Sequence, residues 1–357
     1  MPVNEELKIK TEIVRVDAEN PDESVMKRAG EILKRGGLVA FPTETVYGLG
    51  GDALNPEASK CIYAAKGRPS DNPLIIHIAD WEHLLPIVSH VPEKAHVLAE
   101  KWWPGPLTMI FDKADCVPYE TTGGLETVAV RMPSHKTAAA LIRAAGGYIA
   151  APSANTSGRP SPTTAQHVVE DLNGKIDMII DSGAVDIGLE STIVDFTEDI
   201  PVILRPGYIN EDMLRKILGE VKLDPGLQSE NEHVRPKAPG MRYRHYAPKA
   251  DLTIVEGKQE DVVRKINDLA GKALTDGHKV AIMAATETAS SYKEGSVRVM
   301  GSLESDEEIA RSLFAALREF DDEGVDVIYS EAFESPRMGQ AIMNRLLKAA
   351  GHKVIEA

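Results

Sequence analysis

The chain has 357 residues, with 40 Lys and Arg against 55 Asp and Glu, a net charge of −15 and a hydrophobic fraction of 43%. This length suggests two domains, and the hydrophobic fraction allows each of them to bury a core. The acidic balance argues against sequence-independent binding of nucleic acid, which needs a broad basic face. We therefore expect any anionic ligand to bind in a local basic pocket.

The amino-terminal residues are charged and lack the apolar stretch of a secretory signal. No apolar run approaches the roughly 18 residues that a membrane-spanning helix needs. Cys61 and Cys116 stand in no CxxC or Cys/His cluster, which argues against a disulfide framework or a structural zinc site. We expect a cytoplasmic protein with two reduced thiols and no membrane partner.

Helix and strand signals alternate from Asn20 onward. Asn20 and Pro21 predict the start of a helix that ends at Gly36, and residues 38–41 predict a short buried strand. A second helix is predicted from Asn55 to Lys66. Further strands are predicted at 74–78, 107–111, 128–132, 148–151, 178–181, 191–196 and 202–204, and further helices at 134–145, 163–172 and 210–219. This succession predicts a mixed α/β sheet.

The stretch 223–240 interrupts the alternation, because it holds three prolines and two glycines among few apolar residues. From Leu252 the alternation resumes, with strands predicted at 252–255, 279–284, 297–300 and 325–330 and helices at 259–274, 305–320 and 337–350. We predict a catalytic domain over 1–222, a linker over 223–248 and a smaller, doubly wound, Rossmann-like domain over 249–357.

Polar side chains are densest where predicted strands end. Because ligands of open α/β sheets bind beyond the carboxyl ends of the strands, we expect these side chains to meet in one cleft. Hydroxyl groups and one Asn accompany five cations there: Lys66, Arg68, Arg131, Arg159 and Arg205. Such a set suits the binding of phosphates and a carboxylate. The GxxxxGK[ST] and GxGxxG signatures are absent, and the glycine-rich run 48–51 is a weak signal alone.

Simpler interpretations of these residues stay open at this point. Lys66 and Arg68 can complement the dipole at the end of a helix. The segment 153–163 can be a turn-rich loop that leads into a helix cap. Arg131 can be a surface cation, and His77 can be a core histidine.

Seven ordered motifs resemble the threonylcarbamoyl-adenylate synthase family, which is built on the YrdC-like domain. They are FPTETVYGLG (41–50), AKGRPSDNPLIIHI (65–78), WWPGPLT (102–108), VAVRMP (128–133), APSANTSGRPSPT (151–163), ESTIVD (190–195) and ILRPG (203–207). The family's Lys-x-Arg…Ser-x-Asn signature is present as Lys66-Gly67-Arg68 and Ser153-Ala154-Asn155. APGMRYRHYAP (238–248) resembles the linker of the long form of the family, and 249–357 resembles its accessory domain.

The resemblance implies a YrdC-like twisted mixed sheet and a nucleotidyltransferase. The family makes L-threonylcarbamoyl-AMP from L-threonine, bicarbonate and ATP and releases pyrophosphate. This is the first step of threonylcarbamoyladenosine formation next to the anticodon of tRNAs that read ANN codons. Other proteins, the tRNA threonylcarbamoyl-transferase machinery, act downstream, so strong direct tRNA binding by this chain is not expected.

The resemblance also assigns roles to individual residues. It associates threonine with Thr43, His77, Arg131, Ser153 and Ser191. It associates ATP with Arg68, Asn72, Thr127, Asn155, Thr163 and Arg205, and Lys66 and Arg68 would act in catalysis near the carbamate or the phosphates. Mg²⁺ would arrive with ATP, because no carboxylate cluster announces a metal site of the protein.

The linker carries Arg242, Arg244, His245 and Tyr246 within a few positions. We expect this segment to fold over the ATP site as a lid that excludes water, with His245 near the nucleotide; packing between the domains is the alternative. Two other classes of function fit the sequence less well. An RNA-binding module is disfavoured by the net charge and the few aromatic residues, and a carbamoyl-phosphate enzyme of metallocentre assembly is disfavoured by the absence of zinc-finger and acylphosphatase segments.

Overall fold

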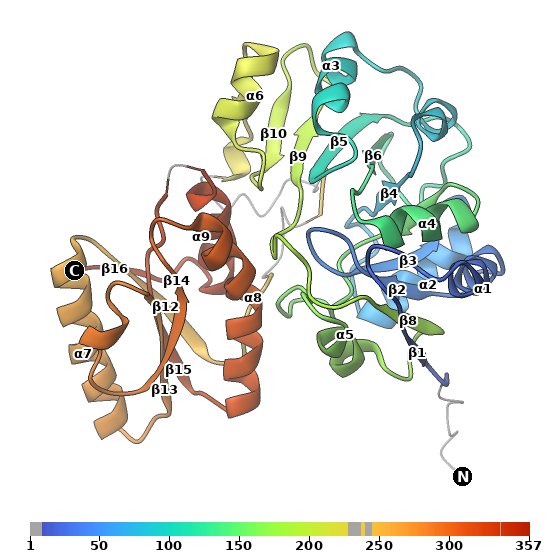
Figure 1. Cartoon of the computed structure of the whole chain (residues 1–357). Helices are drawn as coiled ribbons and strands as arrows, with labels where there is room; N and C mark the ends of the chain where they lie inside the picture. Colours follow the sequence, from blue (N-terminus) through green and yellow to red (C-terminus); the bar gives the residue numbers. More distant parts are fainter. Residues whose placement is uncertain (1–8, 228–236, 240–244, 336) are drawn as a thin grey trace.

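The protein folds into two α/β parts, each built around one sheet (Figure 1). The computed structural model describes residues 9–227, 237–239, 245–335 and 337–357. The first sheet has 11 strands of mixed direction, and the second has five strands that are all parallel. The predicted fold class, a mixed α/β sheet followed by a smaller parallel-sheet domain, is confirmed.

The strands of the first sheet do not follow one another in chain order. From one edge to the other they are β1 (Glu12–Arg15), β8 (Met178–Asp181), β2 (Val39–Phe41), β3 (Gly48–Asp52), β7 (Ile149–Ala151), β4 (Ile75–His77), β6 (Thr127–Arg131), β5 (Leu107–Asp112), β9 (Thr192–Asp195), β10 (Val202–Arg205) and β11 (Lys222–Leu223). In the middle of the sheet, β4 runs parallel to β6 and antiparallel to β7. This local reversal decides where the candidate site lies.

Helices cover the two faces of this sheet unequally. The apolar sides of α2 (Pro56–Lys66), α3 (Glu93–Trp102), α5 (Ala165–Leu172) and α6 (Glu211–Leu218) pack in one core with Ala40, Ile76 and Val130. On the opposite face α1 (Glu23–Lys34) and α4 (Lys136–Ala144) pack against Val39 and Phe41. Because side chains alternate along a strand, His77 and Arg131 project on the α1/α4 face, and His77 indeed meets the ring edge of Phe41. The α1/α4 pair covers only part of that face.

One local prediction needs correction, and one strand was not predicted. The first helix begins at Glu23 with Asp22 as its cap, because the Asp22 carboxylate accepts hydrogen bonds from the backbone N–H of Ser24 and Val25. The glycine-rich run is strand β3. A Cβ atom on Gly50 would lie 2.8 Å from Cγ2 of Ile149, so the absence of side chains lets β3 fit between its neighbours.

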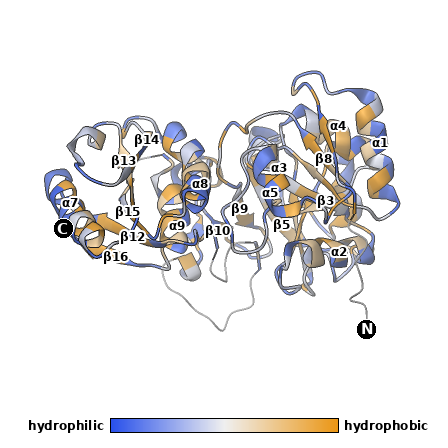
Figure 2. Ribbon diagram, turned by 90° about the horizontal axis from the view of Figure 1, so that it is seen from below, coloured by the Kyte–Doolittle hydropathy of each residue, from blue (hydrophilic) through white to orange (hydrophobic). Residues whose placement is uncertain are grey.

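The second sheet has the strand order β14 (Ser296–Gly301), β13 (Val280–Ala285), β15 (Val327–Glu331), β12 (Asp251–Glu256) and β16 (Val354–Glu356). Helix α7 (Gln259–Thr275) packs on one face, and α8 (Asp306–Glu323) and α9 (Gly339–Ala349) pack on the other. Figure 1 shows α8 and α9 between the second sheet and the first part of the chain. Figure 2 shows hydrophobic residues gathered along the central strands of both sheets.

The two parts pack closely together. A Cβ atom on Gly188, which has a φ of +84°, would lie 2.6 Å from Cα of Arg311 on α8. The core of the second part also includes Val46 and Leu189 from the first part and Tyr246 from the linker. Short 3₁₀ turns complete the described structure at Trp81–His83, Leu85–Ile87, Pro225–Leu227 and Ala289–Ser291. Among the residues that the structure describes, no helix is long and apolar enough to cross a bilayer.

Candidate active site

An open pocket of about 670 Å³ lies on the α1/α4 face of the first sheet, over strands β7, β4 and β6. The residues around it include ten of the thirteen that the sequence suggested: Thr43, Lys66, Arg68, His77, Arg131, Ser153, Asn155, Ser191, Arg205 and His245. The predicted convergence is therefore present.

The prediction that these side chains meet beyond the carboxyl ends of the strands is wrong. His77 pairs with Ile149 in the antiparallel ladder between β4 and β7, so Ser153, beyond the end of β7, lies toward the opposite end of β4. The carboxyl ends of β4 and β7 thus point in opposite directions. The polar groups meet across the face of the sheet, and a mixed sheet brings them there from both ends.

Lys66 fixes one wall of the pocket. It is the last residue of α2, its side chain is buried, and its Nζ donates to the backbone carbonyls of Ser153 and Asn155. Burial lowers the pKa of Lys66 well below its ordinary value, and the neighbouring Arg68 adds to this effect. Arg68 follows in the same wall, and its guanidinium donates to the backbone carbonyls of Asn72 and Pro73.

Arg131 is held by a buried carboxylate. Its Nη2 lies 2.8 Å from Oε1 of Glu44, its Nη1 donates to Oγ1 of Thr45 at 2.8 Å, and both charged side chains are buried. Thr43 uses its hydroxyl within the same turn, where it donates to the carbonyl of Val46. The guanidinium of Arg131 is therefore fixed in direction while it lines the pocket, which excludes the alternative of a surface cation.

Arg205 joins the pocket to the linker. It is buried at the end of β10 and donates from Nε to the carbonyl of Ser191 at 3.0 Å and from Nη2 to Oγ of Ser191 at 3.1 Å. Its Nη1 donates to the carbonyl of Pro239 at 3.1 Å. Burial lowers the pKa of Arg205 to about 10, which leaves the side chain charged at neutral pH. Oγ of Ser191 also lies 2.8 Å from Oγ1 of Thr108.

The two histidines of the pocket are neutral. Burial, aided by Arg131, lowers the pKa of His77 to about 3, and burial, aided by Arg68, does the same for His245. The Nδ1 of His77 lies 3.1 Å from the carbonyl of Ile75. At neutral pH these rings add hydrogen-bonding atoms to the pocket without adding charge.

Three of these thirteen residues, and the predicted cation Arg159, lie outside the lining. Thr127 begins β6 and pairs with Asp112, at the other end of the strand from Arg131. Thr163 lies against Nδ1 of His167, and Asn72 is buried behind Arg68 with its side-chain oxygen unpartnered. The fifth predicted cation, Arg159, pairs with Asp171. The expectation that all five cations meet in one cleft is therefore wrong for Arg159.

The linker contributes to the pocket from outside the sheet. Pro239, His245 and Tyr246 are among the lining residues, and the backbone N–H of Ala247 donates to the carbonyl of Gly158 at 2.9 Å. Burial and the nearby Glu190 raise the pKa of Tyr246 to about 12, and its ring stacks on Phe314 of α8. Arg242 and Arg244, which the sequence also suggested, lie outside the described residues.

Glu190 lines the pocket, although no role was predicted for it. It is buried, and it accepts hydrogen bonds from Oγ of Ser161 and from Nε of Arg345. Burial alone would raise its pKa, but Arg345 and Arg205 outweigh burial, so the pKa of Glu190 is lowered. Its position next to Ser191 in the sequence was the available signal. No group of three or more potential metal ligands occurs among the residues that the structure describes.

A pocket that gathers buried cations with hydroxyl groups is typical of an enzyme that binds and orients small anionic substrates. A family model described as Telomere recombination matches residues 31–207, and one described as the C-terminal domain of threonylcarbamoyl-AMP synthase matches residues 209–351. The threonylcarbamoyl-AMP synthase of Pyrococcus abyssi is 49% identical over 95% of this chain and 97% of its own length. That of Bacillus subtilis is 48% identical over 92% and 93%.

A solved structure gives the same result. The crystal structure of Pyrococcus abyssi Sua5 complexed with L-threonine is 48% identical to this chain and covers 97% of it and 100% of its own chain, with a TM-score of 0.92. The chain belongs to the threonylcarbamoyl-AMP synthase family. It is therefore an enzyme of tRNA modification.

Proposed function

We propose that the chain makes L-threonylcarbamoyl-AMP from L-threonine, bicarbonate and ATP, with release of pyrophosphate, and is thus a nucleotidyltransferase. The observation that carries this proposal is one pocket lined by four cations, Lys66, Arg68, Arg131 and Arg205. The similarity to the synthases of Pyrococcus abyssi and Bacillus subtilis supports the same reaction. The residue roles that follow belong to the proposal.

The threonine end of the pocket is the region around Arg131. Two of its nitrogens are already held by Glu44 and Thr45, so the planar fork has a fixed direction before a substrate arrives. A fixed guanidinium suits a carboxylate, because it loses little freedom when the two bond. The hydroxyls of Ser153 and Ser191 stand in the same lining, where each would exchange a present hydrogen bond within the protein for one to the threonine hydroxyl.

The phosphate end is the region of Arg68 and Arg205. Both side chains are buried and carry guanidinium groups, which suit the neutralisation of phosphate charge. Nζ of Lys66 donates to backbone carbonyls, so the first role of Lys66 is to hold the wall that carries Ser153 and Asn155. Mg²⁺ enters as part of the substrate MgATP.

The reaction proceeds in two steps. Bicarbonate condenses with the threonine amine to give a carbamate and water. A carbamate oxygen then attacks the α-phosphorus of ATP, the bond from that phosphorus to the oxygen that bridges to the β-phosphorus breaks, and pyrophosphate leaves. Since both reactants are anions, the protein contributes mainly by holding them close together and by offsetting their repulsion.

The test is pyrophosphate release by the full chain, measured with ATP, bicarbonate and threonine and then with each one omitted. We expect release only with all three, and no adenylyl-enzyme after an acid quench. Arg131→Gln should raise the KM for threonine about tenfold or more, because a charge-assisted pair is lost. Arg143→Gln, which changes an exposed arginine paired with Asp80, is the matched control. Release without threonine, or a recovered covalent enzyme, would contradict the proposal.

The product belongs to the cytoplasm, where tRNA is modified. We propose that the threonylcarbamoyl group passes from it to tRNA on separate transferase machinery, so this chain need not grip tRNA itself. The net charge of −15 agrees with that division of labour.

A further inference from the structure

Two arginines of the second part of the chain are buried against the first part. Arg318 lies on α8 and Arg345 lies on α9, and their side chains are 1% and 0% exposed. Burying a guanidinium is unfavourable unless its donors are satisfied. The partners of both arginines therefore indicate what these side chains hold.

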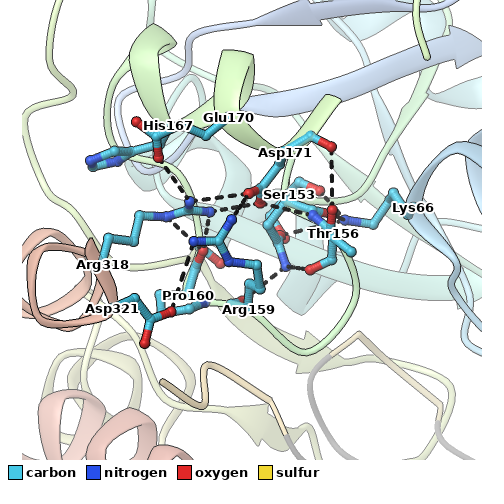
Figure 3. Close-up of polar contacts among 12 residues, drawn as sticks. Lys66, Ser153, Thr156, Arg159, Pro160, His167, Glu170, Asp171, Arg318 and Asp321 are labelled. Atoms are coloured by element: carbon cyan, nitrogen blue, oxygen red, sulfur yellow. Dashed lines mark hydrogen bonds and ion pairs between the residues drawn. The ribbon is translucent and has the colours of Figure 1, made fainter. Parts of the chain in front are cut away.

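Arg318 holds a carboxylate and a carbonyl of the first part. Its Nη2 and Nη1 donate to the two oxygens of Asp171 at 2.8 and 3.3 Å, and its Nη2 and Nε donate to the carbonyl of Pro160 at 2.7 and 3.2 Å. Figure 3 shows Arg318 reaching from α8 to Asp171 beside Arg159. The contact is thus two-pronged on Asp171 and shared with the backbone of the neighbouring loop.

The loop that Arg318 reaches is a wall of the pocket. Oδ2 of Asp171 accepts a hydrogen bond from the backbone N–H of Thr156 at 2.9 Å. Asn155, which lines the pocket, donates from Nδ2 to the carbonyls of Thr156 and Arg159 at 2.8 and 2.9 Å. Hydrogen bonds therefore run without a gap from Arg318 through Asp171 and Thr156 to Asn155, whose carbonyl Lys66 holds from the other side.

Arg345 holds the opposite wall. Its Nε donates to Oε2 of Glu190 at 2.9 Å and its Nη1 donates to the carbonyl of Pro206 at 2.8 Å. Glu190 itself lines the pocket. Glu190 and Pro206 are the chain neighbours of Ser191 and Arg205, so this arginine fixes the backbone on which those two groups stand.

We infer that Arg318 and Arg345 are positioning residues, through which the second part of the chain sets the two walls of the active site. The inference concerns the same pocket as the proposed function and rests on that function for its kinetic arm. Neither arginine lines the pocket. Arg318 acts through the Asp171 carboxylate on α5 and the Pro160 carbonyl, and Arg345 acts through the Glu190 carboxylate and the Pro206 carbonyl.

The test uses the full chain and separates positioning from stability. Arg318→Met leaves the buried Asp171 carboxylate with Arg159 but without the two-pronged contact from Arg318, which lowers the melting temperature and the activity together. The double variant Arg318→Met/Asp171→Asn removes that charge while the Asn oxygen still accepts from Thr156. We expect the double variant to regain most of the melting temperature but to stay about tenfold below native in kcat/KM, because Pro160 is no longer held.

Hydrogen exchange supplies a readout that needs no substrate. Amide exchange across 153–160 should become about tenfold faster in Arg318→Met and in the double variant, while peptides from the core strand β4 stay protected. Arg345→Lys, which keeps the charge but loses the fork, should raise exchange across 205–207 and lower kcat/KM. Arg311→Met is the matched control, because Arg311 also lies on α8 and reaches the first part at the carbonyl of Asp186, in an exposed place.

Two results together would overturn the inference. In Arg318→Met/Asp171→Asn, the activity would return along with the melting temperature, and amide exchange across 153–160 would be unchanged. If Arg311→Met changed kcat/KM and amide exchange as much as Arg318→Met does, the inference would be overturned as well. Any contact between the two parts would then have the same effect on the pocket. If native protein releases no pyrophosphate with threonine, the proposed function fails, whereas the exchange result still decides whether these arginines hold the pocket walls.

Discussion

Replacing Arg205 by lysine tests how much of the active site depends on one guanidinium. The side chain makes three hydrogen bonds from three different nitrogens, two to Ser191 and one to Pro239 of the linker. Lysine preserves the charge but presents one nitrogen. In Arg205→Lys at most one of the three acceptors keeps its partner in the original direction.

The expected magnitude follows from the lost bonds. Two charge-assisted hydrogen bonds are worth about 1.5–3 kcal/mol each, so their loss is about 3–6 kcal/mol before water compensates. The pocket is open, and water can satisfy part of this demand, so we take the lower end, about 3 kcal/mol. That free energy corresponds to a drop of roughly 100- to 200-fold in kcat/KM.

The assay is threonine-dependent pyrophosphate release, measured with limited proteolysis of the linker. Arg205→Lys should lose activity and, because Pro239 is released, expose the linker to a protease sooner than in the native chain. Arg215→Lys is the control: this exposed arginine pairs with Glu211 on its own helix and should change kcat/KM less than about twofold. If kcat/KM of Arg205→Lys stays within threefold of the native value, and the protease cleaves the linker no sooner than in the native chain, the reasoning is refuted.

Three further predictions address the other groups of the pocket. Glu44→Gln should raise the KM for threonine more than it lowers kcat, because Arg131 loses its buried partner; an unchanged KM would show that Glu44 does not orient the fork. Because the pKa of His77 and of His245 is about 3 in the folded chain and 6.5 is its ordinary value, the unfolded chain binds protons first, so stability is complete above about pH 6.5 and falls as the pH drops toward 3. Each histidine should lower the free energy of unfolding by about 2 kcal/mol at pH 5 relative to pH 7.5. In urea titrations at these two pH values, His77→Gln should remove the contribution of His77 to this difference. The exposed His90→Gln should leave the difference unchanged. Serine should react weakly rather than not at all, since one methyl group is worth about 1–3 kcal/mol; equal kcat/KM for serine and threonine would contradict a pocket shaped around that methyl.

The periodic elements of the fold could be predicted from the sequence. The helix expected at 259–274 is α7 at Gln259–Thr275, and the strand expected at 279–284 is β13 at Val280–Ala285. Strand β3 was missed because glycines carry no hydrophobic pattern, although its place between β2 and β7 depends on their missing side chains. Edge strand β1 is mostly exposed and gives no buried signal either.

Most residues of the site could be predicted from the sequence, but the hydrogen bonds that hold them in place could not. Residues such as Lys66 and Arg131 were found because they stand in ordered motifs near the ends of elements. The hydrogen bonds between Arg318 and Asp171 and between Arg345 and Glu190 join residues 147 and 155 positions apart. No local pattern announces such contacts, because they arise only when α8 and α9 pack on the first sheet. The same holds for the direction of β7 against β4.

The two buried ion pairs between the parts of the chain also constrain how this protein can evolve. Each places one charge in each part, so a change in one partner alone leaves the other buried charge with fewer partners. Substitutions at Asp171 and Arg318, or at Glu190 and Arg345, should therefore occur together across lineages. If a descendant lost the second part of the chain, the two carboxylates in the first part would have to be replaced as well. The two parts are therefore expected to be inherited together.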